Sequence, residues 1–153
     1  MSTIANSRLT AALGAVLLVG LAAEGATIPL IDELREEHIV IGLALLVPVA
    51  AKLASTGYRF AHYYLRTPAY VRKGPPPLAL RLLAPGVVFT TVCLFGTGVA
   101  LELGGESDQL LFLHKVSFIA WFGLMSIHVL GHVLELPRLL FPGRRSSKVE
   151  EAR

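Results

Sequence analysis

The sequence predicts an all-α protein, an integral-membrane four-helix bundle with both termini in the cytoplasm. The first observation is its composition: of 153 residues, 54% are apolar or aromatic and only 16% are charged. Soluble domains have about 25% charged residues, and a soluble domain of this size has too much surface to bury so many apolar side chains. The composition therefore argues against a soluble globule, a disordered chain and a nucleic-acid-binding module, and it favours contact with a lipid bilayer.

The second observation is a series of long apolar stretches. A membrane-crossing helix needs about 20 mostly apolar residues, and four stretches of the chain meet this requirement. Within them, Glu24 is the only charge of the first stretch, and Lys52 is the only charge of the second before Tyr58. The runs lack the alternation of barrel strands, so helices are expected. We predict one transmembrane domain over residues 1–153, with helices at about residues 9–31, 38–63, 80–103 and 110–136.

The third observation is the sign of the charges between these stretches. Residues 32–37 and 102–108 are acidic, whereas residues 59–81 and the tail 138–153 are basic. Because cytoplasmic loops are enriched in Lys and Arg, the basic loop and tail are expected inside the cell and the acidic loops outside. The pattern predicts a multi-pass protein of the cell membrane. An alternative is that residues 1–26 are a cleaved signal peptide, which would leave three helices.

The polar residues inside the apolar stretches are the candidate functional residues, because ionisable groups in a membrane are costly. His38 and Lys52 are 14 residues apart, and so are His114 and His128. Fourteen helical residues rise about 21 Å and return to nearly the same face. Since the second and fourth helices run parallel, His38 and His114 are expected at one depth near the outer face. Lys52 and His128 are expected at a second depth nearer the inner face.

Two imidazoles at one depth on facing helices are the arrangement that holds a haem iron between axial ligands. On the fourth helix, aromatic side chains of the same face would line the flat macrocycle. On the second helix, Gly42 would let a ring approach the backbone one turn from His38. The predicted cofactor-binding residues are His38, His114, His128, Lys52, Gly42, Phe118, Trp121 and His132, of which the metal ligands are His38, His114 and His128.

This pattern resembles the di-haem cytochrome b superfamily of four-helix membrane proteins. That superfamily includes small bacterial cytochromes b and the membrane subunits of formate dehydrogenase and nickel–iron hydrogenase. Residues 52–60 (KLASTGYRF) and 113–118 (LHKVSF) also look like an uncharacterised group of small four-helix membrane proteins. The superfamily resemblance implies haem b and electron transfer between a quinone pool and partner redox proteins. Lys52 replaces the histidine of the pattern, so one haem is expected and a second is in doubt.

Several residues keep two interpretations at this point. Lys52 either extends to the inner headgroups or a buried ion pair, or ligates iron. Glu24 either reaches the outer interface or faces the outer site as a proton acceptor or quinone partner. His128 and His132 are either hydrogen-bonding partners between helices or a ligand and its neighbour. Residues 96–98 (GTG) are expected to be a packing surface without chemistry.

The leading functional hypothesis is a b-type cytochrome-like electron-transfer component that works with a redox partner protein or a quinone, rather than a stand-alone enzyme. The alternative is a haem-free scaffold or assembly subunit of a larger complex, in which the histidines only pack and form hydrogen bonds. A weaker third hypothesis is a transporter or metal handler that uses His128, His132 and Glu24. Oligomerisation or membership of a larger complex is compatible with each of the three.

Overall fold

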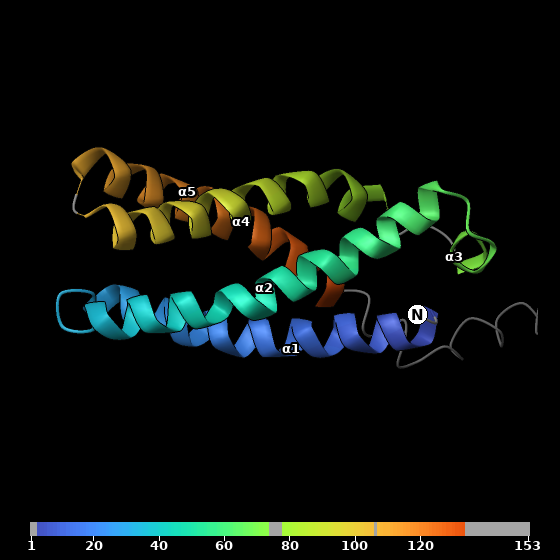
Figure 1. Ribbon diagram of the computed structural model, residues 1–153, viewed down its shortest axis with the longest axis horizontal. Helices are drawn as coiled ribbons and strands as arrows, with labels where there is room; N and C mark the ends of the chain where they lie inside the picture. Colours follow the sequence, from blue (N-terminus) through green and yellow to red (C-terminus); the bar gives the residue numbers. More distant parts are fainter. Residues whose placement is uncertain (1–2, 74–77, 106, 134–153) are drawn as a thin grey trace, which may run out of the picture.

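The computed structural model describes residues 3–73, 78–105 and 107–133, and these residues form an all-α structure (Figure 1). The four helices α1, α2, α4 and α5 are long and apolar enough to cross a membrane. This confirms the predicted class and the four long helices. The elements are α1 (Thr3–Thr27), the 3₁₀ helix η1 (Ile28–Leu30), α2 (Arg35–Tyr64), α3 (Pro68–Lys73), α4 (Leu78–Gly104) and α5 (Asp108–Val133).

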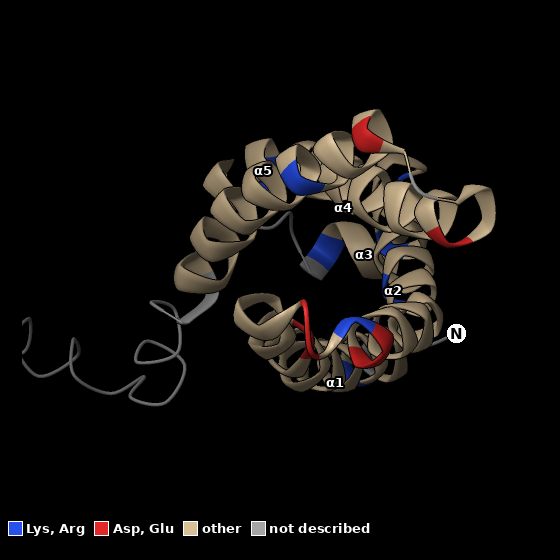
Figure 2. Ribbon diagram, turned by 90° about the vertical axis from the view of Figure 1, so that its left-hand side faces the viewer, with Lys and Arg blue, Asp and Glu red and all other residues tan. Residues whose placement is uncertain are grey.

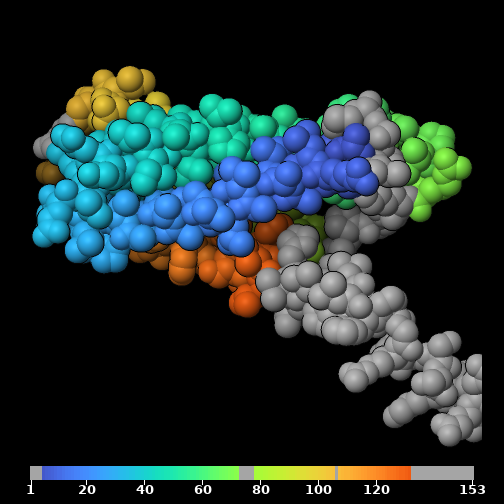
Figure 3. Space-filling model, turned by 90° about the horizontal axis from the view of Figure 1, so that it is seen from below, coloured from blue at the N-terminus to red at the C-terminus, as the bar shows by residue number. Residues whose placement is uncertain are grey.

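The long helices are arranged as two antiparallel hairpins. One hairpin consists of α1 and α2, the other of α4 and α5, and the two meet mainly where α2 lies along α4 (Figure 1). Figure 3 shows α1 and α2 side by side, with α5 coming to the surface next to α1. Because both hairpins turn at the same end, α2 and α5 run in the same direction. The two helices that carry the candidate histidines therefore belong to different hairpins.

The outer surface of the bundle is apolar. Val19, Val47 and Leu82 are examples, with 72%, 75% and 74% of their surface exposed. An exposed apolar surface of this extent marks contact with a membrane or another protein. The buried apolar core is correspondingly small and consists of Leu45, Val49, Tyr70, Leu80 and Trp121.

The helix bounds differ from the prediction at two places. α1 begins at Thr3 rather than near residue 9, because the polar side chains of its first turns pack against α2. The segment 59–81, expected as a loop, is largely helical, since α2 continues to Tyr64, α3 follows, and α4 begins at Leu78. Residues 74–77, the end of the fourth predicted helix at 134–136 and the tail 138–153 lie outside the described residues.

Acidic residues gather at one end of the bundle, where they outnumber the two basic residues Arg35 and Lys115. The end with both hairpin turns carries acidic residues, as Figure 2 shows from that side. There α4 ends at Gly104, followed by Gly105 with φ 80°, a conformation that favours glycine after a helix. The Ser107 hydroxyl accepts from the Leu110 N–H at 3.4 Å and caps α5. Among the described residues, the acidic ones of this end are Asp32, Glu33, Glu36, Glu37, Glu102 and Asp108.

Candidate functional site

The structure brings His38 of α2 and His114 of α5 together near the acidic end of the bundle. Their ring centroids are 6.5 Å apart and the ring planes are perpendicular, at 89°. Both residues are half-buried. The two imidazoles that the sequence places at one depth are thus neighbours in space, although they belong to different hairpins.

The side chain of His114 is oriented by Thr97 of α4. Thr97 Oγ1 lies 3.0 Å from His114 Nδ1, and the threonine hydroxyl donates to the carbonyl of Cys93 at 2.8 Å. A threonine hydroxyl that donates to a carbonyl of its own helix can accept from the imidazole. This arrangement favours the tautomer of His114 with its hydrogen on Nδ1 and with Nε2 free.

His38 is oriented in the same way by the last turn of α1. Thr27 Oγ1 lies 2.7 Å from His38 Nδ1 and donates to the carbonyl of Glu24 at 2.6 Å. Glu24 Oε1, at 3.2 Å from the same ring nitrogen, is a second acceptor. The two neighbouring oxygens favour the tautomer of His38 with its hydrogen on Nδ1 and with Nε2 free. Histidines that bind metals are held by a second group at the other ring nitrogen in this manner.

The carboxyl group of Glu24 is turned inward rather than toward the outer interface. Its side chain is 16% exposed, and Oε2 is buried without a hydrogen-bond partner among the described residues. Gly42 provides the space, because a Cβ at this position would lie 3.0 Å from Glu24 Oε1. Gly42, expected to let a ring approach the backbone, accommodates the carboxyl group that holds His38. Glu24 thus lies beside His38, and its carboxyl group does not extend to the outer interface.

The sequence does not single out Thr27, and it predicts only a packing role for residues 96–98. In the structure Thr97 binds His114, and a Cβ on Gly98 would lie 3.2 Å from His114 Cε1. The available signal was a threonine between two glycines in the uncharged stretch 82–101. The face that α4 turns toward α5 cannot be read from that signal, because α4 is apolar on all sides.

Lys52 makes its contact within the first hairpin. Its Nζ donates to the carbonyl of Thr10 on α1 at 2.5 Å, and a Cβ on Gly14 would lie 3.1 Å from the same nitrogen. The ammonium group therefore points toward α1. Ligation of iron by Lys52 stays a prediction, and it would require this contact to break.

A buried polar cluster surrounds the Lys52 contact. Asn6 is fully buried, with 0% of its surface exposed, and Ser55 is 5% exposed. The Ser55 hydroxyl donates to Asn6 Oδ1 at 3.2 Å, and Asn6 Nδ2 donates to the Ser55 carbonyl at 3.4 Å. The hydroxyl groups of Thr10 and Ser55 are also hydrogen-bonded to each other. Hydrogen bonds between membrane helices contribute roughly 0.6 kcal/mol each. The bonds of this cluster therefore add to the packing that holds α1 against α2.

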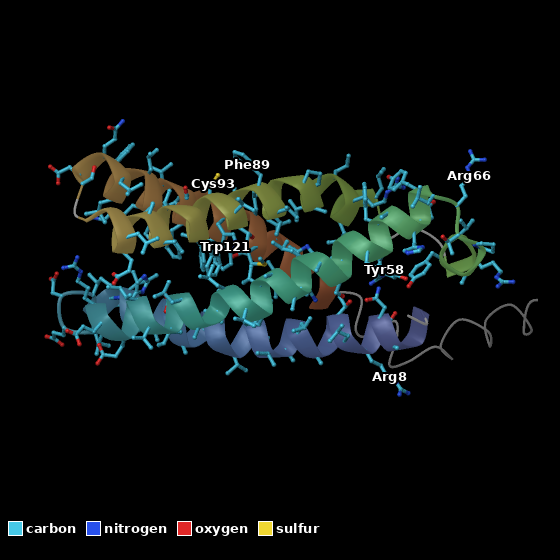
Figure 4. The ribbon with its side chains drawn as sticks, viewed as in Figure 1. Arg8, Tyr58, Arg66, Phe89, Cys93 and Trp121 are labelled. Atoms are coloured by element: carbon cyan, nitrogen blue, oxygen red, sulfur yellow. The ribbon has the colours of Figure 1, made fainter. Side chains whose placement is uncertain are left out.

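The remaining candidates lie along α5. Figure 4 shows Trp121 between the ribbons of the two hairpins, and only 7% of its surface is exposed. Its Nε1 donates to Thr91 Oγ1 at 3.0 Å, and its ring is stacked with Phe118 at a centroid distance of 6.5 Å. His128 is half-buried nearer the basic end. The side chain of His132 lies outside the described residues.

The donor groups at His38 and His114 are suited to a haem more than to a bare metal ion. Within the described ranges, no group of three or more His, Cys, Asp or Glu side chains is placed to hold a metal. Zinc needs three or four protein ligands, whereas a haem iron takes four nitrogens from its macrocycle and needs at most two from the protein. A pair of imidazoles with free Nε2 atoms meets the second requirement.

The four long helices and the apolar outer surface place this chain in the class of helical proteins built like multi-pass membrane proteins. No protein-family model matches the chain, and neither a curated protein nor a solved structure matches it.

Proposed function

We propose that this chain is inserted in the cell membrane with both termini in the cytoplasm. The proposal is supported by the four apolar helices and by the separation of charge between the two ends of the bundle. Arg59, Arg66, Arg72 and Arg81 lie in a segment without any acidic residue. The positive-inside rule assigns such a segment to the cytoplasm.

Within this membrane protein, His38 and His114 would be the residues that hold one haem b between α2 and α5. The observation that carries this assignment is that each Nδ1 atom lies beside a threonine oxygen, at 2.7 Å for His38 and 3.0 Å for His114, an arrangement that would leave both Nε2 atoms for iron. The two ring centroids lie 6.5 Å apart, so both imidazoles could reach one group bound between them. A bound haem supplies one-electron redox chemistry.

The residues of the chain contribute orientation and surroundings to this electron transfer. Thr97 and Thr27 fix the rotation of the two imidazoles, and the apolar helices keep the site at low dielectric. The protein is thus an electron-transfer component of an oxidoreductase system, and a redox protein or a quinone is its partner. The site lies near the acidic end, which faces outward in the proposed orientation. We therefore expect electrons to be exchanged on the outer side.

The test is a reduced-minus-oxidised visible spectrum of the purified full-length protein. We expect a b-type α-band in the wild type and its loss in His38→Ala and in His114→Ala. The matched control is His62→Ala, which changes a histidine at the basic end that bonds Thr67 at 2.9 Å, and it should keep the band. Wild-type protein that takes up no haem, even when haem is supplied during expression, would rule out the cytochrome function.

The second candidate function is a haem-free subunit that helps to assemble a larger membrane complex. An open apolar groove of about 360 Å³ between α2 and α4 favours it, because such a groove accepts an apolar helix of a partner. Leu46, Val49 and Phe95 are among its lining residues. Absence of haem together with copurification of a stoichiometric membrane partner would support this function over the first.

A further inference from the structure

A second candidate site lies at the opposite end of the bundle, where α2 turns into α3. The turn is closed by hydrogen bonds from the Arg66 N–H to the Tyr63 carbonyl at 3.1 Å and from the Thr67 N–H to the His62 carbonyl at 3.0 Å. Arg66 adopts φ 56°, and it is the one non-glycine residue with positive φ in the described part of the chain. Glycine or asparagine is usual at this position after a helix, because a longer side chain is strained there.

An aromatic cluster fixes α3 against the end of α2. The rings of His62 and Tyr70 are stacked with centroids 5.3 Å apart. The ring centroids of Tyr58 and His62 are 4.2 Å apart. Tyr70 is buried, with 7% of its surface exposed. A hydrogen bond between His62 Nδ1 and Thr67 Oγ1 at 2.9 Å completes the connection. The position of α3, and with it the shape of the surface between α3 and α2, is therefore defined by packing.

Between these two elements lies an open cavity of about 640 Å³, whose walls are apolar and aromatic apart from two guanidinium groups. Figure 4 shows Arg66 beyond the end of α2, with its side chain projecting from the turn. Arg81 of α4 donates to the Tyr64 hydroxyl at 3.3 Å and places a third cation next to the cavity. The lining residues are Tyr63, Tyr64, Arg66, Pro68, Val71 and Arg72.

The charge of this cavity and its position at the end of α2 indicate which chemical groups a ligand would need. No acidic residue occurs between residues 38 and 101, so the guanidinium groups have no carboxylate partner from this segment. The apolar span of α2 ends at Tyr64, which places the cavity at the level of the lipid headgroups once the helix crosses a membrane. Guanidinium groups bind phosphate through paired hydrogen bonds, and the apolar walls suit the upper part of an acyl chain.

We propose that this cavity binds the phosphate and glycerol region of an anionic phospholipid in the cytoplasmic leaflet, with Arg66 and Arg72 as the phosphate-binding residues. The proposal rests on the membrane orientation given above and is independent of haem. The strained backbone of Arg66 is consistent with this role, since strain of this kind is often associated with binding sites. The basic end of the protein is thereby anchored to negatively charged lipid.

The test is native mass spectrometry of the full-length protein in detergent, titrated with dioleoyl phosphatidylglycerol or with dioleoyl phosphatidylcholine. We expect tighter binding of the anionic lipid to the wild type. Arg66→Asn and Arg72→Gln should each weaken it about fivefold, the equivalent of about 1 kcal/mol per arginine near a membrane surface. Asparagine tolerates the positive φ of position 66, so Arg66→Asn should not unfold the turn, and circular dichroism checks this.

The matched control is Arg8→Gln, which removes an equal charge from the exposed surface of α1, outside the cavity. It should leave lipid affinity unchanged, and addition of inorganic phosphate should not displace the lipid. Equal affinity for the two lipids, an equal loss in the control, or displacement by inorganic phosphate would overturn the proposal.

Haem content should be the same in all three variants, because the cavity lies at the other end of the bundle from His38 and His114. A failure of the lipid site is thus distinguishable from a failure of the haem site.

Discussion

His114 and Thr97 are joined by a hydrogen bond of 3.0 Å between Nδ1 of the imidazole and the threonine oxygen. The threonine hydroxyl also donates within its own helix, so this contact orients the ring and favours the hydrogen on Nδ1. In the proposed function it prepares Nε2 for iron. The bond therefore offers a direct way to perturb the site without removing a ligand.

Thr97→Val should weaken haem binding by about 10- to 100-fold, the usual effect of removing a group that orients a metal ligand. Valine keeps the shape of threonine but cannot accept from Nδ1. The measurement is haem retention during competition with apomyoglobin, followed by the visible spectrum. Thr97→Ser keeps the hydroxyl and should bind haem like the wild type. If the two variants behave alike, the hydrogen bond does not orient a ligand.

Glu24→Gln should raise the midpoint potential of the haem. The Glu24 carboxyl group lies 3.2 Å from Nδ1 of His38, and a negative charge there favours the oxidised, more positive iron. Glutamine keeps the hydrogen bond through its carbonyl oxygen and removes the charge. A redox titration of both proteins at one pH measures the difference. An unchanged potential, with haem content also unchanged, would show that the carboxyl group has no electrostatic effect on the iron.

Gly98→Ala should disturb the site, whereas Gly96→Ala should not. A Cβ at Gly98 would lie 3.2 Å from His114 Cε1, whereas nothing lies within 4 Å of a Cβ at Gly96. The gain in helix propensity is the same at both positions, so the difference between the variants isolates the contact with the ring. We expect lower haem occupancy in Gly98→Ala alone, by less than in Thr97→Val. The absorbance ratio of the Soret band to the protein band measures it.

The number of long helices, and the pairing of His38 with His114, could be predicted from the sequence, because apolar length and the 14-residue spacing are properties of single helices. The partners of these histidines could not. Whether Thr27 and Thr97 face the imidazoles depends on the rotation of α1 and α4, and helices that are apolar on all sides carry little information about rotation. Glu24 could be recognised as unusual, but its inward position depends on the space left by Gly42 across the hairpin.

The structure of the basic segment 59–81 could be predicted only in part. The second helix was predicted to end at about residue 63, and α2 ends at Tyr64. The short helix α3 was missed because its stability comes from the contacts of Tyr70 with Tyr58 and His62, which join residues on two different elements. Local propensity contributes little to a helix of six residues.

Asn6→Ala should destabilise the first hairpin by about 1 kcal/mol, because it removes both hydrogen bonds between the Asn6 side chain and Ser55. Unfolding by sodium dodecyl sulfate in mixed micelles measures the change. Ser117→Ala, at a half-buried serine of α5, is the comparison variant and should have a smaller effect. Equal effects would mean that the polar cluster adds nothing specific to the contact of α1 with α2.

Lys52→Met should leave the haem content unchanged. The ammonium group of Lys52 donates to the Thr10 carbonyl at 2.5 Å and so points toward α1, whereas the proposed haem lies between α2 and α5. Methionine fills a similar volume without the charge, and the Thr10 carbonyl keeps its bond within α1. The pyridine haemochrome assay gives haem per protein, and we expect about one in both the wild type and the variant. A value near two in the wild type that falls to one in Lys52→Met would show instead that Lys52 ligates a second iron. His128→Ala would then lose the same haem, because His128 is the residue expected at the depth of Lys52 on α5.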